Sequence, residues 1–229
     1  MIKLSCVCAD HESGGAPLAG AASVGPLGTI VGSDYTYYID GQQYQGYMSY
    51  SSDLKPGSAP AALIVHQWMG LGGMEKLRAD EMASHGYIAF AVDMYGAGKR
   101  ATTSAQAVQY MHEVTDHPTL LQQRARKGID LLKSVPGTNA SAIVANGYCF
   151  GGLVVLELAR QTAPVAAVAS FHGELGNLTT PNPLMGGIPV QVHHGDLDSQ
   201  GTSGLNAFED QIRPLYSNGG TCDTHKYGK

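Results

Sequence analysis

A cysteine between glycines is the residue of this sequence best suited to covalent chemistry. Cys149 lies in the stretch 147–152, between the short apolar run 142–145 and a second apolar run at 153–159. The first run predicts a buried strand and the second a helix, which is the context of a nucleophile elbow. At a helix start, the dipole and free N–H groups favour a thiolate and would stabilise an oxyanion on an attacked carbonyl. The alternative is a small buried residue in a glycine-rich turn.

Two aspartates could supply the carboxylate of such a site. A cysteine nucleophile needs a base that accepts its proton and usually a carboxylate that orients this base. The run 188–193 predicts a late strand, and Asp196 and Asp198 follow it directly. We choose Asp198 as the acid and keep Asp196 in reserve. The competing interpretation is that both side chains cap a turn or the next helix.

The elements that would position these residues alternate along the chain from Tyr35 onward. Short apolar runs alternate with helical patterns, which predicts an α/β fold with a mostly parallel sheet and helices on both faces. Asp40-Gly41, between two tyrosine-rich runs, predicts an antiparallel hairpin at the start of the sheet. Further strands are expected at 61–66, 87–92, 142–145, 164–170 and 188–193, and helices at 74–84, 104–114, 119–134, 153–159 and 205–217.

Length and charge restrict the classes of protein. With 229 residues the chain can bury one core, so we assign 33–229 to a single domain. Residues 1–32 are rich in Gly, Ala, Ser and Pro and predict a flexible lead-in. The balance of 14 Lys+Arg against 19 Asp+Glu, without a basic run, argues against nucleic acid as a partner. No membrane-length apolar run or secretory signal is present, which predicts a cytoplasmic protein that does not bind membranes.

The cysteines do not form a disulfide or metal pattern. Cys6, Cys8, Cys149 and Cys222 are too few and too unevenly spaced for a disulfide framework. Only one residue separates Cys6 from Cys8, which does not match the usual spacing of zinc ligands. We therefore expect no metal and no cofactor. The expected partner is a small-molecule substrate, and the sequence leaves the oligomeric state open.

Several ordered motifs together resemble the dienelactone hydrolase family of α/β-hydrolases, over about residues 35–229. The matching stretches are Val65-His66-Gln67-Trp68-Met69-Gly70-Leu71, Gly86-Tyr87, Asp93-Met94-Tyr95-Gly96, the cysteine elbow, Ser170-Phe171-His172-Gly173, and His194-Gly195 with Asp198. The resemblance implies the α/β-hydrolase fold and a carboxymethylenebutenolidase-like cleavage of a small ester or lactone through a cysteine acyl-enzyme. It implies that Cys149 is the nucleophile and that Asp198 orients a histidine. It also implies an oxyanion hole formed by the backbone N–H groups of Phe150 and Trp68.

Two features depart from the family pattern. Gln67 occupies a pocket position where family members commonly have glutamate, and an amide cannot carry that charge. The family's catalytic histidine lies a few residues beyond the pair that Tyr227-Gly228 resembles, whereas this sequence stops at Lys229. We therefore expect that the C-terminal part is missing. The nearest histidine is His225, which we keep as a candidate base against the alternative of a solvated terminus.

Other polar residues on the expected active-site edge leave alternatives open. Histidines at strand ends are more often hydrogen-bonded scaffold than base, which is our interpretation of His66, His172, His193 and His194. Three cations could bind a substrate carboxylate but are more typical of a solvated face, and they stay unassigned: Lys99, Arg100 and Arg124. The alternative functions are a catalytically silent binding protein on the same scaffold and a metal-dependent hydrolase built on residues 193–198.

Overall fold

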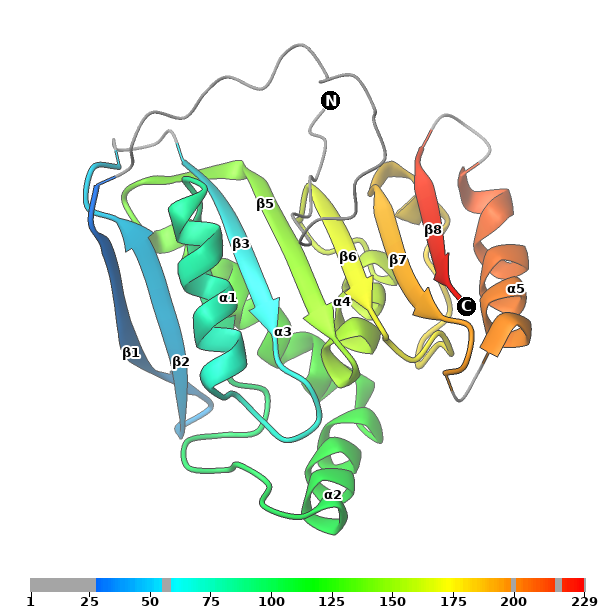
Figure 1. Cartoon of the computed structure of the whole chain (residues 1–229), viewed down its shortest axis with the longest axis horizontal. Coiled ribbons are helices and arrows are strands. Elements are labelled where there is room, and N and C mark those ends of the chain that lie inside the picture. The colour runs from blue at the N-terminus through cyan, green and yellow to red at the C-terminus, as the bar shows by residue number, and fades with distance from the viewer. Residues whose placement is uncertain (1–27, 55–58, 199–200, 217–219, 229) are drawn as a thin grey trace.

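The computed structural model describes residues 28–54, 59–198, 201–216 and 220–228. These residues form an eight-stranded sheet with helices on both faces (Figure 1). The strands are β1 Ile30–Ile39, β2 Gln42–Ser51, β3 Ala59–Val65, β4 Ile88–Val92, β5 Thr138–Tyr148, β6 Ala167–Phe171, β7 Val190–Gly195 and β8 Cys222–Tyr227. The helices are α1 Gly73–Ser84, α2 Ser104–Thr115, α3 Pro118–Ser134, α4 Phe150–Arg160 and α5 Gly201–Ile212, with short 3-10 turns η1 Pro183–Gly187 and η2 Arg213–Tyr216. None of these helices is long and apolar enough to cross a membrane.

The predicted hairpin and parallel sheet are confirmed. The strand order is β1-β2-β4-β3-β5-β6-β7-β8, in which β1, β2 and β4 pair antiparallel and the remaining neighbours pair parallel. Asp40 and Gly41 both have positive φ angles, of 50° and 82°, as a tight two-residue hairpin turn requires. The sheet therefore has the mixed character that the sequence predicts.

Several element boundaries differ from the sequence expectation, most clearly at the two ends of the described chain. Residues 30–32, which we assigned to the lead-in by composition, belong to β1 because they pair with the end of β2. The last helix begins earlier than predicted, at Gly201, and ends at Ile212, where η2 follows. Pro214 lies in that turn and has no N–H to continue an α-helix. Residues 1–27, with Cys6 and Cys8, lie outside the described residues.

The core has two layers because side chains of a central strand alternate between the two faces of the sheet. In β3, Ala61, Leu63 and Val65 pack on the side of α3, α4 and α5, whereas Ala62 and Ile64 pack towards α1. All five are at most 1% exposed. Gly128 lets α3 approach this strand closely, since a Cβ there would lie 2.5 Å from Leu63 Cδ1. The sheet is thus fixed from both sides at its centre.

The parallel strands end at one common edge, where the chain leaves each strand for a loop or helix. The register pairs Val65 with Gly147, Tyr148 with Phe171, and Phe171 with His193. Binding sites of open α/β sheets form at this carboxyl edge. The segments that follow β3, β5, β6 and β7 carry most of the sequence-predicted site residues.

Candidate active site

Cys149 lies in the sharp turn between β5 and α4, in a conformation that L-residues rarely adopt. Its φ and ψ are 54° and −114°, and it is the N-cap of α4. Its N–H donates to the Phe171 carbonyl at 2.9 Å, and its own carbonyl accepts from the Gly152 N–H at 2.9 Å. A non-glycine residue at positive φ is strained and is retained where its surroundings hold it, commonly at active sites. The side chain is half-buried.

The glycines around Cys149 are required by space. A Cβ on Gly147 would lie 1.9 Å from the Gly151 carbonyl oxygen, and one on Gly151 would lie 2.3 Å from the Val65 oxygen. A Cβ on Gly152 would lie 2.5 Å from Gly173 Cα. All three neighbours are backbone atoms that cannot rotate away. Glycine is the residue type that fits at these three positions, and its presence there allows the sharp turn to form.

The backbone N–H groups of Phe150, which directly follows Cys149, and of Trp68, in the loop after β3, have no protein acceptor among the described residues. Phe150 is the first residue of α4, so its N–H has no intrahelical partner. The Trp68 carbonyl accepts a hydrogen bond from the buried Tyr95 hydroxyl at 3.0 Å, which fixes the orientation of this loop. Burial raises the pKa of Tyr95, and the nearby Cys149 raises it further. Tyr95 is a site residue that the sequence reasoning did not single out.

The loop that carries Trp68 is fixed from within. The Gln67 side chain does not point to a charged partner; its Oε1 accepts from the Met69 N–H at 2.8 Å. The buried Glu75, in the first turn of α1, accepts from the Gly72 N–H at 2.6 Å and from the Gln67 N–H at 3.4 Å. Glu75 was not predicted, although an acidic residue three positions after a helix N-cap is a recognisable capping signal.

Asp198 is paired with a histidine, and that histidine is His172. The two side chains approach to 2.7 Å between Asp198 Oδ2 and His172 Nδ1. The same oxygen accepts from the Gly195 N–H at 3.1 Å, and His194 Nδ1 lies 3.8 Å away. Partial burial alone would raise the pKa of Asp198, but the hydrogen bonds from His172 and Gly195 and the neighbouring rings hold it below its ordinary value. The carboxylate is thus stabilised in its ionised form.

The other predicted polar residues have different partners. The reserve acid Asp196 lies 3.7 Å from Lys226 and donates its N–H to the Tyr227 carbonyl at 2.8 Å. No hydrogen bond or ion pair joins His225 to Asp198 within the described chain. The His225 ring instead stacks on His193 at 4.8 Å between centroids. The structure therefore brings Asp198 together with His172, and not with His225.

His193 and His66 have the scaffold character that the sequence predicts. His193 stacks on Phe171 at 4.5 Å, and its Nδ1 lies 2.7 Å from the Tyr227 hydroxyl. Burial lowers the pKa of His193, and His225 lowers it further. The His66 ring is fully buried, and its Nε2 accepts from the Met94 N–H at 3.1 Å. Because Nε2 accepts this hydrogen bond it carries no proton, and burial lowers the pKa of His66 in agreement with a neutral ring.

The cations considered for substrate binding are mostly engaged elsewhere. Lys99 pairs with Glu113 at 2.6 Å. Arg124 is buried, contrary to the solvated face expected for it, because it donates to the Met94 carbonyl at 2.6 Å and lies over the Tyr44 ring. Arg100 is exposed and lines a hollow of about 150 Å³. Among the described residues, no three His, Cys, Asp or Glu side chains are grouped so that they could hold a metal ion.

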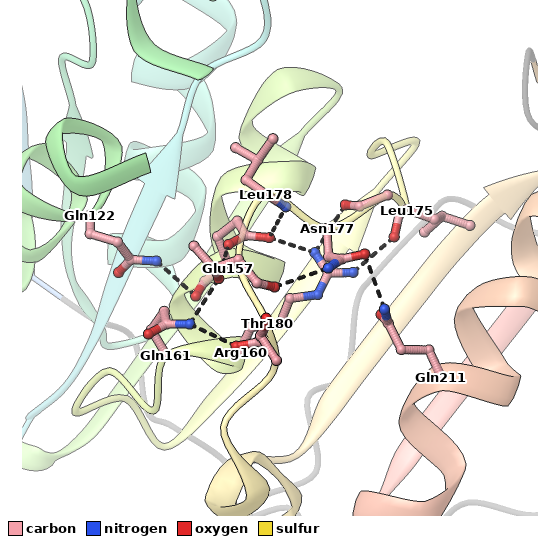
Figure 2. A network of polar contacts seen from close by, with 11 residues as sticks. Gln122, Glu157, Arg160, Gln161, Leu175, Asn177, Leu178, Thr180 and Gln211 are labelled. Carbon is pink, nitrogen blue, oxygen red and sulfur yellow. Dashed lines mark hydrogen bonds and ion pairs between the residues drawn. The ribbon is translucent and has the colours of Figure 1, made fainter. Parts of the chain in front are cut away.

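The helix that begins at the elbow also holds the loop that follows β6. Glu157 and Arg160 form a fully buried ion pair on α4, 2.8 Å apart (Figure 2). Arg160 donates to the Leu175 carbonyl at 2.8 Å, and Glu157 accepts from the Leu178 N–H at 2.9 Å. The loop leaves β6 through His172, so α4 begins beside Cys149 and its last turn binds the loop that carries His172.

Comparison with known proteins gives a consistent result. The sequence model of the dienelactone hydrolase family matches residues 45–216. An uncharacterized protein of Caenorhabditis elegans, K02A2.1, is 35% identical over 102 residues, which cover 43% of this chain and 65% of that protein. The chain spans about half to two thirds of the length of the curated relatives it matches.

Two solved structures are similar over most of their length. One is a dienelactone hydrolase-like promiscuous phosphotriesterase, P91, from metagenomic libraries. It is 26% identical, has a TM-score of 0.75, and the match covers 88% of this chain and 83% of that chain. The other, titled m3DLH, is 26% identical with a TM-score of 0.77 and covers 88% and 82%.

Proposed function

Because this chain belongs to the dienelactone hydrolase family, we propose that it is a hydrolase that cleaves small esters or lactones with Cys149 as its nucleophile. The observation that carries the proposal is the strained conformation of Cys149 at the start of α4, held by three glycines that cannot be replaced. A thiol that only fills space would not need this backbone. In this proposal the thiol faces a substrate bound at the carboxyl edge of the sheet, as in a nucleophile elbow.

In the first step, a histidine takes the thiol proton and the thiolate attacks the substrate carbonyl. The carbonyl π-electrons move to oxygen, and an S–C bond forms. The N–H groups of Phe150 and Trp68 are the oxyanion hole in this proposal, since neither has a protein acceptor among the described residues. The Tyr95 hydroxyl donates to the Trp68 carbonyl, and this hydrogen bond holds Trp68 in place.

In the second step, the C–O bond to the leaving group breaks, and the alkoxide takes the proton from the imidazolium. The acyl group then remains on Cys149 as a thioester. A water molecule, deprotonated by the same ring, attacks the thioester and releases the acid and the free thiol. Asp198, which the surrounding N–H groups keep ionised, orients the ring and stabilises its charged form.

The substrate class is proposed from the family and from the chemistry of the elbow. The similar P91 is described as a phosphotriesterase, so a related scaffold hydrolyses an ester-type centre. We propose a carboxylic ester or lactone for this chain, because a cysteine nucleophile with two N–H donors suits attack on a planar carbonyl.

The test is hydrolysis of p-nitrophenyl acetate and of a small lactone by the purified chain. We expect Cys149→Ala to lower kcat/KM by about a thousandfold or more, since removal of a nucleophile abolishes the covalent route. Cys222→Ala is the matched control. Burial raises the pKa of the Cys222 thiol to about 12, so this cysteine does not supply a thiolate. Equal turnover by Cys149→Ala and the wild type would refute the proposal, and equal absence of turnover in both would favour a silent binding scaffold.

A further inference from the structure

β8 is the last strand of the sheet, and its outer edge is open within the described chain. The strand order gives β8 a single neighbour, β7 (Figure 1). Its six residues include neither proline nor glycine, and they pair with β7 without a bulge. Proline, a bulge or a covering segment commonly protects an edge strand, because free N–H and C=O groups can pair with another strand. Among the described residues, β8 has none of these three protections.

The hydrogen bonds to β7 show which backbone groups of β8 face outward. The carbonyls of Thr221 and Tyr227 accept from N–H groups of β7 and of the residue after it, at 2.9 and 2.8 Å. In a strand the N–H and C=O of one residue point to the same side, and the side alternates from residue to residue. The odd-numbered residues therefore face β7. The N–H and C=O groups of Cys222, Thr224 and Lys226 face outward.

A second copy of β8 can satisfy these outward groups. An isologous pairing places the two strands antiparallel about a two-fold axis, with residues of the same face opposite each other. In the register centred on Thr224, this residue opposes the partner's Thr224, and Cys222 opposes the partner's Lys226. Every outward N–H and C=O of the strand then has an acceptor or a donor on the other copy.

The charges on the other face of the strand favour the same register. In it, the exposed Asp223 opposes the partner's His225, and the two-fold axis repeats this pair. A register centred on Asp223 would oppose two carboxylates, and one centred on His225 would oppose two histidines, which repel when protonated. Opposite charges across a strand pair are stabilising and like charges are destabilising. Within the described chain, Asp223 has no hydrogen bond or ion pair of its side chain that would compete.

The opposite edge of the sheet does not have this complementarity. β1 contains one charged residue, Asp34, and its carboxylate already pairs with Lys76. No cation or histidine on β1 could oppose it across a two-fold axis. The sequence of β8 is therefore the better suited of the two edge strands to pair with itself.

Space is available beside β8 as well. A hollow of about 440 Å³ lies between α5, η2 and β8. Side chains of all three elements line it, among them Glu209, Tyr216, Cys222 and Thr224. The hollow lies on the face of the even-numbered residues, so the side chains of an added strand have room there.

We propose that the chain forms a homodimer in which β8 pairs antiparallel with the partner's β8, centred on Thr224. The two sheets then continue as one, and the interface closes at two copies because it is isologous. This inference does not depend on the hydrolase activity proposed above. In the dissociated chain β8 remains an open edge.

The experiment is sedimentation equilibrium of the full chain over a series of concentrations. We expect the wild type to reach twice the mass of one chain. Thr224→Pro removes the central outward N–H of each copy but no hydrogen bond to β7, since residue 224 faces away from that strand. It should raise the dissociation constant of the dimer at least about a hundredfold, because two central hydrogen bonds are lost and their acceptors stay unpaired.

Thr36→Pro, on the other edge strand, is the matched control. Thr36 is the register partner of Gln45, whose N–H points away from β1 to Asp93 Oδ2 at 3.1 Å. The N–H of Thr36 therefore also faces outward, and its loss should leave the dimer unchanged. Thr224→Val is the second control. It loses the hydroxyl that donates to Glu209 but keeps the N–H, so it should still dimerise.

A charge exchange tests the register. His225→Glu opposes a second carboxylate to Asp223 and should weaken the dimer at least about threefold. Adding Asp223→Lys to this variant should restore association, because the introduced ammonium then opposes the introduced carboxylate of the partner. A loss of fold would not be repaired in this way. Failure of the double variant to associate more tightly than His225→Glu would count against the inference.

Several outcomes would overturn the inference. One is a wild-type chain that keeps the mass of one copy at every concentration, and another is an assembly larger than two copies. A dimer that Thr36→Pro dissociates and Thr224→Pro does not would place the interface at β1. Equal dissociation by Thr224→Val and Thr224→Pro would assign the effect to the hydroxyl and not to the pairing of the backbones.

Discussion

At the level of residues, backbone conformation decides what the side chains can do. The thiol of Cys149 and the ring of His172 both stand on positive φ angles at the ends of paired strands. Neither residue has the backbone conformation of the strand that it follows, so the side-chain alternation of the strand does not continue through it. Glycines and backbone hydrogen bonds stabilise these conformations. The candidate site therefore depends on residues and backbone atoms that take no part in a reaction.

We predict that Gly147→Ala destabilises the protein and abolishes turnover, although residue 147 takes no part in the reaction. The new methyl group would lie 1.9 Å from the Gly151 carbonyl oxygen, so the turn would have to open, at a cost of about 2 kcal/mol or more. Gly73→Ala is the control, since a Cβ there meets nothing within 4 Å, and should change stability by less than about 0.5 kcal/mol. Urea unfolding of both variants tests this, and equal stability of the two would contradict it.

At the level of elements, α4 is the part of the fold on which the site depends most. Its first residues follow Cys149, and its last turn carries the buried pair of Glu157 and Arg160 that binds the loop after β6 (Figure 2). Carbonyl and N–H groups of the loop bind Arg160 Nη1, Arg160 Nη2 and Glu157 Oε1, whereas Arg160 Nε has no hydrogen-bond partner within the described chain. Breaking one partner would leave the other charge buried without compensation.

Two arginine–glutamate pairs with the same helical spacing allow this dependence to be measured. Arg160→Met should destabilise the protein by about 3–5 kcal/mol, because it leaves the Glu157 carboxylate buried without its partner. Arg78→Met removes the exposed pair with Glu81, and such pairs contribute about 1 kcal/mol or less. Chemical denaturation of both variants gives the comparison. Similar losses would show that the buried network does not hold the loop as described.

At the level of the whole molecule, burial falls from the middle of the sheet to its edges. Strands β3 and β4 are buried on both faces, whereas β8 is exposed along most of its length and β1 is exposed over its first half. The carboxyl edge of the parallel strands, where the candidate site lies, runs from the buried end of β3 to the more exposed loop after β7. Cys149 therefore lies near the buried centre of the sheet, and Asp198 lies towards its more exposed side.

Hydrogen exchange should follow this gradient. We expect amides of β3, β4 and central β5 to exchange last, at the free energy of global unfolding, and those of β8 in the dilute, dissociated chain to exchange through local opening. Exchange monitored by mass spectrometry on peptides from each strand measures both. Protection of β8 equal to that of β3 would mean that this edge is covered in solution.

Much of the fold follows from the sequence because it depends on local signals. The alternation of apolar runs with helical patterns gave the strands and helices, and Asp40-Gly41 gave the hairpin. The glycine spacing around Cys149 identified the elbow, since only glycine fits there. Motif order was sufficient to place the chain in its family.

Only the tertiary structure decided which distant side chains meet. Cys149, His172 and Asp198 are far apart in sequence, and their proximity depends on the order and register of β5, β6 and β7. Register is set by packing between strands, which a single sequence does not display. For the same reason, the partners of Asp198 and the contacts of Tyr95 and Glu75 could not be predicted. Sequence determined the turn at Cys149, and the sheet determined which histidine meets the Asp198 carboxylate.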